Sequence, residues 1–235
     1  MASSGATERH GQPPLNDADP RAAEKAEAAR AAAELIEDGM RVGLGTGSTV
    51  AHLLDAIAAR GLGGLRCVAT SPATERAALD LGLAIEELDE LGELDIAIDG
   101  ADQVDPAGWL IKGGGGAHTR EKIVASHARL FVVIASAEKA VQTLRAPVPL
   151  ELIPFAVQST LRALAPARLR DVPRSPDGGV IADYLGAIEE PAELSARLAG
   201  TPGVVEHGLF EPALTGLILI GTGAGVERRV PGASD

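Results

Sequence analysis

The alternation of short apolar runs with helix-like segments over residues 21–135 is the feature that most limits how this chain can fold. The apolar runs predict strands at residues 41–44, 65–70, 83–86, 94–98, 110–111 and 131–135. The segments between them are rich in helix formers and predict helices at residues 21–38, 50–60, 72–81 and 119–129. Most of the strands are apolar on both faces, which is typical of parallel sheets buried beneath helices. We therefore predict an α/β fold with a Rossmann-like parallel sheet covered by helices.

A second pattern begins after about Leu144, where Pro147 and Pro149 mark a boundary. Strands at residues 150–155, 168–172, 180–185 and 204–210 and helices at residues 156–165 and 191–199 follow in β-α-β-β-α-β order. That order is typical of a split βαβ, ferredoxin-like module. The apolar run at residues 217–220 is expected to return to the main sheet.

These patterns predict three parts of the chain. Residues 1–20 are rich in Ser, Gly, Pro, Asp and Asn and are expected to form a disordered tail. Residues 21–143 together with 212–235 form the predicted Rossmann-like catalytic domain, and residues 144–211 form the smaller ferredoxin-like α+β domain.

Composition excludes several classes of partner. The net charge of −12 argues against nucleic acid and anionic membranes, since both require a basic face. No stretch approaches the roughly 20 apolar residues of a membrane span, and no secretory signal begins the chain. The single cysteine, Cys67, lies in an apolar run and is expected to be buried. One cysteine excludes an internal disulfide framework and fits a reducing compartment, so we expect a cytoplasmic protein.

Polar or glycine-rich segments stand where four predicted strands end. Because ligands of open parallel sheets bind beyond the carboxyl ends of the strands, these segments are candidates for one site: Gly45–Thr49, Thr70–Ser71, Asp99–Asp102 and Lys112–Gly116.

The last of these contains four consecutive glycines between a strand and a helix. Glycine costs backbone entropy and offers no side chain to bury, so such a run indicates close approach of the backbone to a ligand. A flexible linker is the alternative, although linkers seldom join a strand directly to a helix.

The segment Gly43–Thr49 is typical of a phosphate cradle, because glycines allow close approach and the following helix presents its positive end. It lacks the G-x-G-x-x-G spacing of dinucleotide sites and the lysine of nucleoside-triphosphate loops. A phosphate monoester is therefore favoured over both. A tight turn that caps a helix remains the structural alternative.

Charged residues flank these segments. Asp99, Asp102 and Asp105 could bind a metal, but the five histidines are scattered and calcium-loop spacing is absent. Helix capping by Asp102 is the structural alternative. Glu121 falls in the first turn of the helix after the glycines, where it either complements the helix dipole or acts as a general base. Lys112 could stabilise negative charge that develops on a substrate.

The chain resembles a known family, ribose-5-phosphate isomerase, type A, from about Lys25 to the Gly221–Thr222 region. Six stretches match in the right order: Gly45–Thr49, Asp99–Asp102, Lys112–Gly115, Arg120–Ala125, Ser136–Lys139, and Pro202–Val205 with Gly208–Phe210. The chain departs from the family at Gln103, where glutamate is usual, and near His118, where an apolar residue is usual.

The resemblance implies interconversion of D-ribose 5-phosphate and D-ribulose 5-phosphate, a step of the non-oxidative pentose phosphate pathway, without a metal or an organic cofactor. It implies that Glu121 moves a proton between C2 and C1 through an enediolate, assisted by Asp99, Asp102 and Lys112. It also implies a homodimer or a dimer of dimers. The implied substrate-binding set is Lys25, Thr46, Gly47, Ser48, Thr49, Asp99, Gly100, Ala101, Asp102, Lys112, Gly113, Gly114, Gly115 and Lys139.

Two other functions remain open. A non-catalytic sugar-phosphate sensor of related fold would need a DNA-binding module, and residues 1–20 are too short and too acidic to form one. An amino-sugar-phosphate deaminase or lactonase would need a histidine-centred base, and His118 is the histidine close enough to a strand end to serve.

Overall fold

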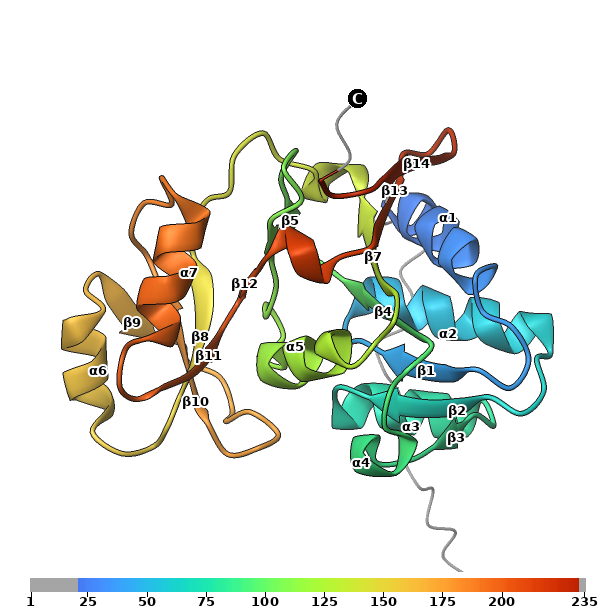
Figure 1. Ribbon diagram of the computed structural model, residues 1–235, viewed down its shortest axis with the longest axis horizontal. Helices are drawn as coiled ribbons and strands as arrows, with labels where there is room; N and C mark the ends of the chain where they lie inside the picture. The colour runs from blue at the N-terminus through green and yellow to red at the C-terminus, as the bar shows by residue number, and fades with distance from the viewer. Residues whose placement is uncertain (1–20, 233–235) are drawn as a thin grey trace, which may run out of the picture.

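The large sheet follows the alternation of the sequence (Figure 1). The computed structural model describes residues 21–232, so the predicted disordered tail at 1–20 lies outside the described residues. The sheet has seven strands in the order β14-β13-β7-β4-β1-β2-β3. Their bounds are β1 Arg41–Leu44, β2 Arg66–Ala69, β3 Ala84–Ile85, β4 Ile96–Gly100, β7 Phe131–Ser136, β13 Leu217–Gly221 and β14 Val226–Arg229.

All neighbouring strands of this sheet pair in parallel except β13 and β14, which are antiparallel. As predicted, the run at residues 217–220 returns to the main sheet, beside β7. The order of β3, β2, β1, β4, β7 and β13 is that of a doubly wound sheet, and the direction of winding reverses between β1 and β4. The carboxyl ends of β1 and β4 therefore flank the position where such sheets bind ligands.

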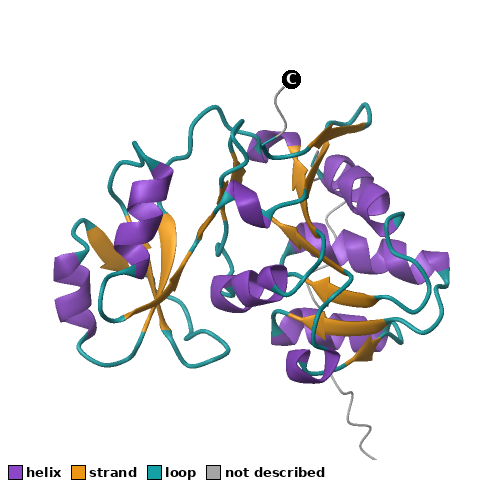
Figure 2. Ribbon diagram, in the orientation of Figure 1, coloured by secondary structure: helices purple, strands orange, loops and turns teal. Residues whose placement is uncertain are grey.

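Helices cover both faces of the large sheet (Figure 2). One core, between the sheet and helices α1 to α3, is built from Ala, Val, Leu and Ile side chains such as Ala28, Leu53 and Ile98. The other core lies beneath α4 and α5 and includes Val124, Phe131 and Phe210. The helix bounds are α1 Ala22–Ala33, α2 Ser48–Arg60, α3 Pro72–Asp80, α4 Leu88–Leu91 and α5 His118–Ser126.

The helices start and stop where local chemistry dictates. Ser71 caps α3 by accepting a hydrogen bond from the Thr74 amide, and Pro72 occupies the first helical position. Helix α1 is shorter than the predicted 21–38. The amides of Leu35 and Ile36 bond three residues back, to Ala32 and Ala33, and this tighter pattern ends the α-helix.

A second sheet of four antiparallel strands forms a smaller module, drawn in yellow and orange in Figure 1. Its order, β11-β8-β10-β9, is the one expected of the β-α-β-β-α-β arrangement, and the predicted α/β fold class is confirmed. The division of the chain into domains stays a prediction. The elements are β8 Val148–Leu152, α6 Val157–Ala163, β9 Ala167–Leu169, β10 Val180–Tyr184, α7 Pro191–Ala199 and β11 Val204–His207.

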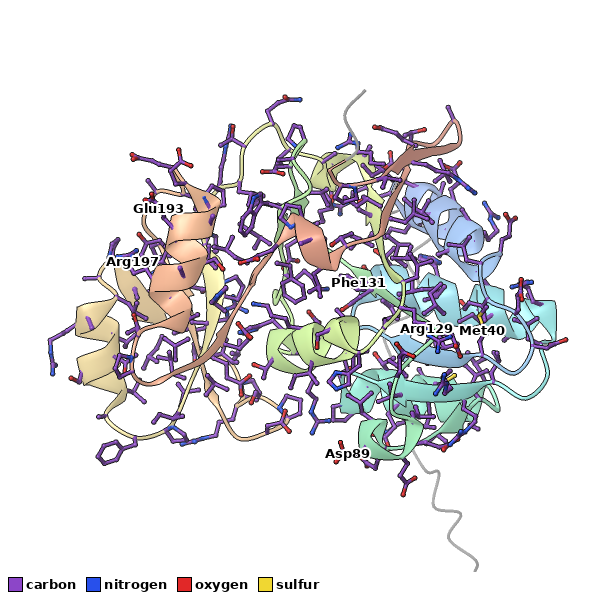
Figure 3. All side chains as sticks on the ribbon, in the orientation of Figure 1. Met40, Asp89, Arg129, Phe131, Glu193 and Arg197 are labelled. Atoms are coloured by element: carbon purple, nitrogen blue, oxygen red, sulfur yellow. The ribbon has the colours of Figure 1, made fainter. Side chains whose placement is uncertain are left out.

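Helix α7 illustrates how the module packs. Leu194 and Leu198, four positions apart, are buried in the module's core. Glu193 and Arg197 project from the same helix and are exposed, whereas Phe131 lies within the large sheet (Figure 3).

A third sheet was not predicted and joins the two parts. It contains β5 Gln103–Val104, β6 Leu110–Ile111 and β12 Leu209–Phe210 in the order β12-β6-β5. Two expectations are therefore corrected: residues 110–111 do not belong to the parallel sheet, and the strand predicted at 204–210 is divided at Gly208. The Gly208 amide bonds to Pro149, and its carbonyl accepts from the Lys112 amide at 2.8 Å. A β-carbon on Gly208 would lie 2.2 Å from the Lys112 carbonyl oxygen, so this contact requires glycine.

Two short 3₁₀ helices complete the fold, at Ala137–Lys139 and Pro212–Leu214. Cys67 is buried as predicted, and burial raises the pKa of its thiol to about 12. Within residues 21–232, no helix combines the length and the apolar character needed to cross a membrane.

Candidate active site

A cavity of about 220 Å³ opens at the winding reversal between β1 and β4. It is smaller than the roughly 300–1,000 Å³ of pockets that bury drug-sized ligands, and so suits a small metabolite. The segments that the sequence identified at the ends of β1, β4 and β6 meet here. The lining residues are Arg21, Lys25, Thr46, Gly47, Ser48, Thr49, Gly100, Ala101, Asp102, Lys112, Gly113, Gly114, Gly115, Glu121, Glu138 and Lys139.

The turn between β1 and α2 forms one wall of the cavity. Its N-cap, Gly47, has a φ of +114°, a conformation that favours glycine, and no side chain caps the helix. The N-terminus of α2 is therefore open beside Ser48 and Thr49, while Lys25 and Lys139 line the same cavity. Unpaired amides at a helix N-terminus together with two ammonium groups form a site suited to a phosphate.

The conformation of this turn depends on Asp99. Asp99 Oδ1 accepts hydrogen bonds from the amides of Thr46, at 3.0 Å, and Gly100, at 2.7 Å. A β-carbon on Gly45 would lie 1.9 Å from that oxygen, so only glycine allows the approach. The Thr46 hydroxyl bonds to that of Thr70 at 2.8 Å. Thr70 therefore supports the wall without lining the cavity itself.

The glycine run forms the opposite wall. Gly113 has a φ of +98°, and the amide of Gly114 donates to Asp102 Oδ2 at 2.7 Å. A β-carbon on Gly114 would lie 2.8 Å from Asp102 Oδ1. The run is thus folded against a carboxylate at the end of β4, which a flexible linker would not require.

Lys112 lies between two buried carboxylates. Its Nζ is 2.7 Å from Asp99 Oδ2 and 3.2 Å from Glu121 Oε2, and it donates a hydrogen bond to the Gly100 carbonyl. The three charged side chains are only 3–5% exposed. Asp99 Oδ2 and Glu121 Oε2 accept no well-aligned hydrogen bond from the described residues, so the ammonium group is the main compensation for their charge.

The pKa values of this cluster follow from burial and from its uneven charge. Burial, together with the negative charge of Asp99, raises the pKa of Glu121 from 4.5 to about 8, although Lys112 acts in the opposite direction. Burial disfavours the charged form of Lys112, but Asp99 and Glu121 outweigh that effect and the pKa of Lys112 is raised. Lys112 therefore stays protonated, and Glu121 is a carboxyl group that gains and loses its proton within the physiological pH range.

Asp99 itself does not line the cavity, although the resemblance places it in the substrate-binding set. Its carboxylate lies behind Lys112 and is occupied by that ammonium group and by the two amides of the β1 and β4 turns. Arg21 and Glu138 line the cavity and were not identified from the sequence as site residues. They form an ion pair with each other, with Arg21 Nη1 at 2.9 Å and 3.0 Å from the two Glu138 carboxylate oxygens. Glu138 lies in the Ser136–Lys139 stretch, which is the signal that could have identified it.

The two departures from the family pattern lie outside the cavity. Gln103 bonds to the backbone of Arg145 through both its side-chain oxygen and its nitrogen, at 2.8 Å and 2.7 Å. His118 is fully buried beneath the glycine run, where a β-carbon on Gly113 would lie 2.6 Å from its Nδ1. Burial lowers the pKa of His118 to about 4. These features do not support the histidine-centred base considered above.

The basic residues next to Glu121 pair with carboxylates. Arg120 bonds to Asp177 at 2.8 Å and 2.7 Å, and Lys122 bonds to Glu206 at 2.7 Å. Across the part of the chain that the structure describes, no group of three or more His, Cys, Asp or Glu side chains is arranged to hold a metal ion.

Comparison with known proteins is consistent with this geometry. Residues 66–225 match the sequence model of ribose 5-phosphate isomerase A (phosphoriboisomerase A). A ribose-5-phosphate isomerase A from Caulobacter sp. (strain K31) is 47% identical over 216 residues, which cover 86% of this chain and 95% of that protein.

Solved structures agree over most of their length. Ribose 5 phosphate isomerase A from Neisseria gonorrhoeae superposes with a TM-score of 0.87 at 32% identity, covering 91% of this chain and 98% of that one. A D-ribose-5-phosphate isomerase in complex with phospho-erythronic acid superposes with a TM-score of 0.82 at 35% identity, covering 88% and 97%.

Proposed function

The chain belongs to the ribose 5-phosphate isomerase A family, and from that premise we propose that it interconverts D-ribose 5-phosphate and D-ribulose 5-phosphate by general-base catalysis. One observation carries the mechanism: Glu121, a carboxylate with a raised pKa, lines the cavity beside the ammonium group of Lys112. An aldose and its ketose differ by the position of one carbon-bound and one oxygen-bound proton. A base and a neighbouring cation are the groups such a transfer needs.

Glu121 acts as the base. In the open-chain aldose its carboxylate removes the proton from C2, and the electrons move into the C1 carbonyl to give an enediolate. The same carboxyl group then returns the proton to C1 while the proton of the O2 hydroxyl passes to O1, and these two transfers complete the ketose. The raised pKa supports this role, because a base whose pKa lies near the working pH can both accept and release a proton.

Lys112 stabilises the negative charge that develops on the substrate oxygens. Asp99 keeps this ammonium group charged and in place from behind, at 2.7 Å. Asp102 lines the cavity and is the group on the open side of the cluster that can assist ring opening and the movement of the oxygen-bound proton.

The phosphate binds at the N-terminus of α2. Thr46 to Thr49 offer amides and hydroxyls, and Lys25 and Lys139 add positive charge. Gly100, Ala101 and Gly113 to Gly115 line the space between the phosphate and Lys112. A structural relative in complex with phospho-erythronic acid, a phosphorylated sugar acid, supports this class of substrate.

Three further properties stay predictions. A homodimer or tetramer and a role in the non-oxidative pentose phosphate pathway follow from the resemblance, and a cytoplasmic location follows from the single cysteine. The net charge of −12 supports the expectation of a small-molecule substrate over nucleic acid or a membrane.

The direct test follows D-ribulose 5-phosphate formation from D-ribose 5-phosphate, and the reverse reaction, with the purified chain. We expect saturable conversion in both directions and no conversion by a Glu121→Gln preparation above a small residual rate. If the unaltered chain binds ribose 5-phosphate without converting it, the proposal is wrong and the sugar-phosphate sensor replaces it.

A further inference from the structure

Arg170 extends from the small module to the glycine run of the cavity. It directly follows β9, and its amide continues the β9–β10 ladder by donating to the Ile181 carbonyl at 3.0 Å. Its Nη1 donates to the carbonyl oxygens of both Gly113 and Gly114, each at 3.0 Å. Arg170 does not line the cavity, so any effect on the reaction passes through the glycines.

One peptide unit connects Arg170 to Asp102. The carbonyl of Gly113 accepts from the guanidinium group, and the amide of the same peptide, that of Gly114, donates to Asp102 Oδ2 at 2.7 Å. A positive group at the oxygen and a negative group at the N–H both favour the same direction of the peptide dipole. Hydrogen bonds arranged in such a chain strengthen one another.

Asp183 fixes the guanidinium group from the opposite side. Its Oδ1 lies 2.5 Å from Arg170 Nη2 and its Oδ2 lies 3.2 Å from Arg170 Nε, the two-point geometry that orients an arginine. The Arg170 and Asp183 side chains are only 17% and 12% exposed, so solvent weakens this pair little.

The backbone of the glycine run depends on hydrogen bonds from side chains outside the run. Glycine restricts its own backbone less than any other residue, and the run offers no side chain to hold it. Asp102 fixes the amide of Gly114, and the carbonyl of Gly113 accepts from the Gly116 amide at 3.0 Å. Arg170 is the side chain that bonds to the carbonyls of both Gly113 and Gly114. Without this contact the peptide that meets Asp102 keeps only the bonds to the Gly116 amide and to Asp102 itself, and it is held less firmly.

We propose that Arg170 is a positioning residue for the isomerisation: oriented by Asp183, it holds the Gly113–Gly114 peptide so that Asp102 keeps its place in the cavity. The inference rests on the proposed function, because it assigns Asp102 to that reaction. It also makes the small module part of the active-site architecture.

The test compares Arg170→Ala and Arg170→Lys with Asp183→Asn. Displacement of a catalytic group by a remote change can cost about 10²-fold in rate, so we expect kcat of Arg170→Ala to fall by about that factor with a smaller change in KM. Arg170→Lys keeps the charge, but its three N–H donors lie on one nitrogen and cannot reproduce the separate positions from which Nη1 meets the carbonyls and Nη2 and Nε meet Asp183, so its kcat should also fall. Asp183→Asn should cause a smaller decrease.

Asp177→Asn is the matched control. Asp177 forms a two-point pair with Arg120, and that pair also links α5 to the small module, but it is exposed and does not contact the glycines. We expect its kcat to be unchanged. Methylguanidinium added to Arg170→Ala should restore part of kcat and should not change the control.

A second readout is independent of the reaction. Amide hydrogen exchange at Gly114, measured by NMR, should be faster in Arg170→Ala and in Asp183→Asn and unchanged in Asp177→Asn.

Folded Arg170 and Asp183 variants with normal kcat and normal Gly114 exchange would overturn the inference while leaving the proposed function intact. An unaltered chain that fails to isomerise ribose 5-phosphate would instead overturn the proposed function, and the exchange data would then report on the contact alone. Thermal unfolding of each variant identifies any that fails to fold, and the remaining variants decide the outcome.

Discussion

At the scale of single residues, the cavity is built around an imbalance of charge. One ammonium group, Lys112, meets two carboxylates, Asp99 and Glu121, and all three are almost completely buried. A one-to-one pair would leave both partners fully charged and inert. With a second carboxylate present, one of the two is incompletely compensated, and burial favours its neutral form. Burial and the negative charge of Asp99 both raise the pKa of Glu121, so Glu121 is the group that takes up a proton.

The first prediction concerns Glu121→Gln, which keeps the shape and the helical position of the side chain but removes its basicity. Loss of a general base typically lowers kcat by about 10²–10⁴-fold, and we expect a loss in that range with ribose 5-phosphate still bound. Exchange of the substrate C2 hydrogen with solvent should stop as well, because the same carboxylate carries that proton. Stopped assays and proton NMR of the substrate in D₂O measure the two effects.

The matched control is Glu75→Gln. Glu75 also lies in the first turn of a helix, α3, but it is exposed and does not line the cavity. If both variants lose activity equally, or if neither does, Glu121 only complements the helix dipole and the base must be sought at Asp102 or Asp99.

The second prediction concerns stability against pH at the same residue. In the unfolded chain Glu121 loses its proton near its ordinary pKa of 4.5, whereas in the folded protein burial and Asp99 raise that pKa to about 8. Between these values the folded state binds more protons than the unfolded state. The free energy of unfolding therefore falls as pH rises through this window.

Glu121→Gln removes this loss and leaves Lys112 paired with Asp99 alone. We expect its free energy of unfolding to exceed that of the unaltered protein at about pH 8, and the difference to shrink towards about pH 5. Urea unfolding at several pH values measures the difference, with Glu75→Gln as the control. A variant that is less stable at pH 8 would show that the ionised Glu121 stabilises the fold, contrary to the assigned direction of its pKa shift.

At the scale of elements, we expect a change in the turn from β1 to α2 to affect substrate binding and to leave the chemical step almost unchanged. Thr49 lies in the first turn of α2, and Thr49→Ala removes one hydroxyl without altering Gly47 or the helix amides. Hydrogen bonds to charged groups contribute roughly 1.5–3 kcal/mol, so we expect ribose 5-phosphate binding to weaken by about that amount while kcat changes little.

Unphosphorylated ribose provides the control for this third prediction, because it lacks the group that Thr49 contacts. Its turnover, where detectable, should be the same for Thr49→Ala and the unaltered chain. Equal losses with both sugars would mean that Thr49 supports the turn itself. Isothermal titration with Glu121→Gln as the parent chain measures binding without turnover.

The same scale shows which elements the sequence can predict. Strands β1, β2, β4, β7 and β13 are mainly apolar and largely buried, and most of their observed ends lie within two residues of the predicted ones. The missed strands carry weaker signals. Strand β14 reads Val-Glu-Arg-Arg and pairs along one edge only, and β5 has two residues. Both pair with a strand close in sequence, β14 with β13 and β5 with β6, but β14 is polar and β5 is too short for either to show a strand pattern.

In the candidate site, too, some residues could be predicted from the sequence and others could not. Glycine runs and hydroxyls after strands are local signals, which is why Thr46 to Thr49, Asp102 and Lys112 could be predicted. Lys25 and Lys139 came from the resemblance alone, because a lysine on an exposed helix usually has no partner. The contact of Arg170 with the glycine run depends on how the small module packs, and no pattern near Arg170 in the sequence predicts it.

At the scale of the whole molecule, the two parts of the chain meet along the segment that carries the chemistry. Residues 112–121 begin at β6, which pairs with β12, and end in α5, which contacts β8 and β11 of the small module. Figure 1 shows α5 and β12 between the large sheet and the small one. The large sheet supplies Asp99 and the wall proposed to bind phosphate, and the small module contacts the glycine run through Arg170. A change in how the parts pack would therefore alter Lys112 and Glu121 before it altered the phosphate site.

The last prediction also applies to the whole molecule and concerns metals. Family membership and the Lys112 cluster together support an isomerase in which an ammonium group stabilises the enediolate, and this role needs no divalent ion. We expect kcat and KM to be unchanged after exhaustive dialysis against a chelator, with metal content verified by elemental analysis.

Loss of activity on chelation, restored by Mg²⁺, Mn²⁺ or Zn²⁺, would contradict this prediction. It would assign charge stabilisation to an ion held near Asp102, and Lys112→Met would then retain most of its activity when that ion is supplied. If Lys112 is the stabilising cation, the same variant stays inactive with every ion, because Asp99 and Glu121 are left without their compensating charge.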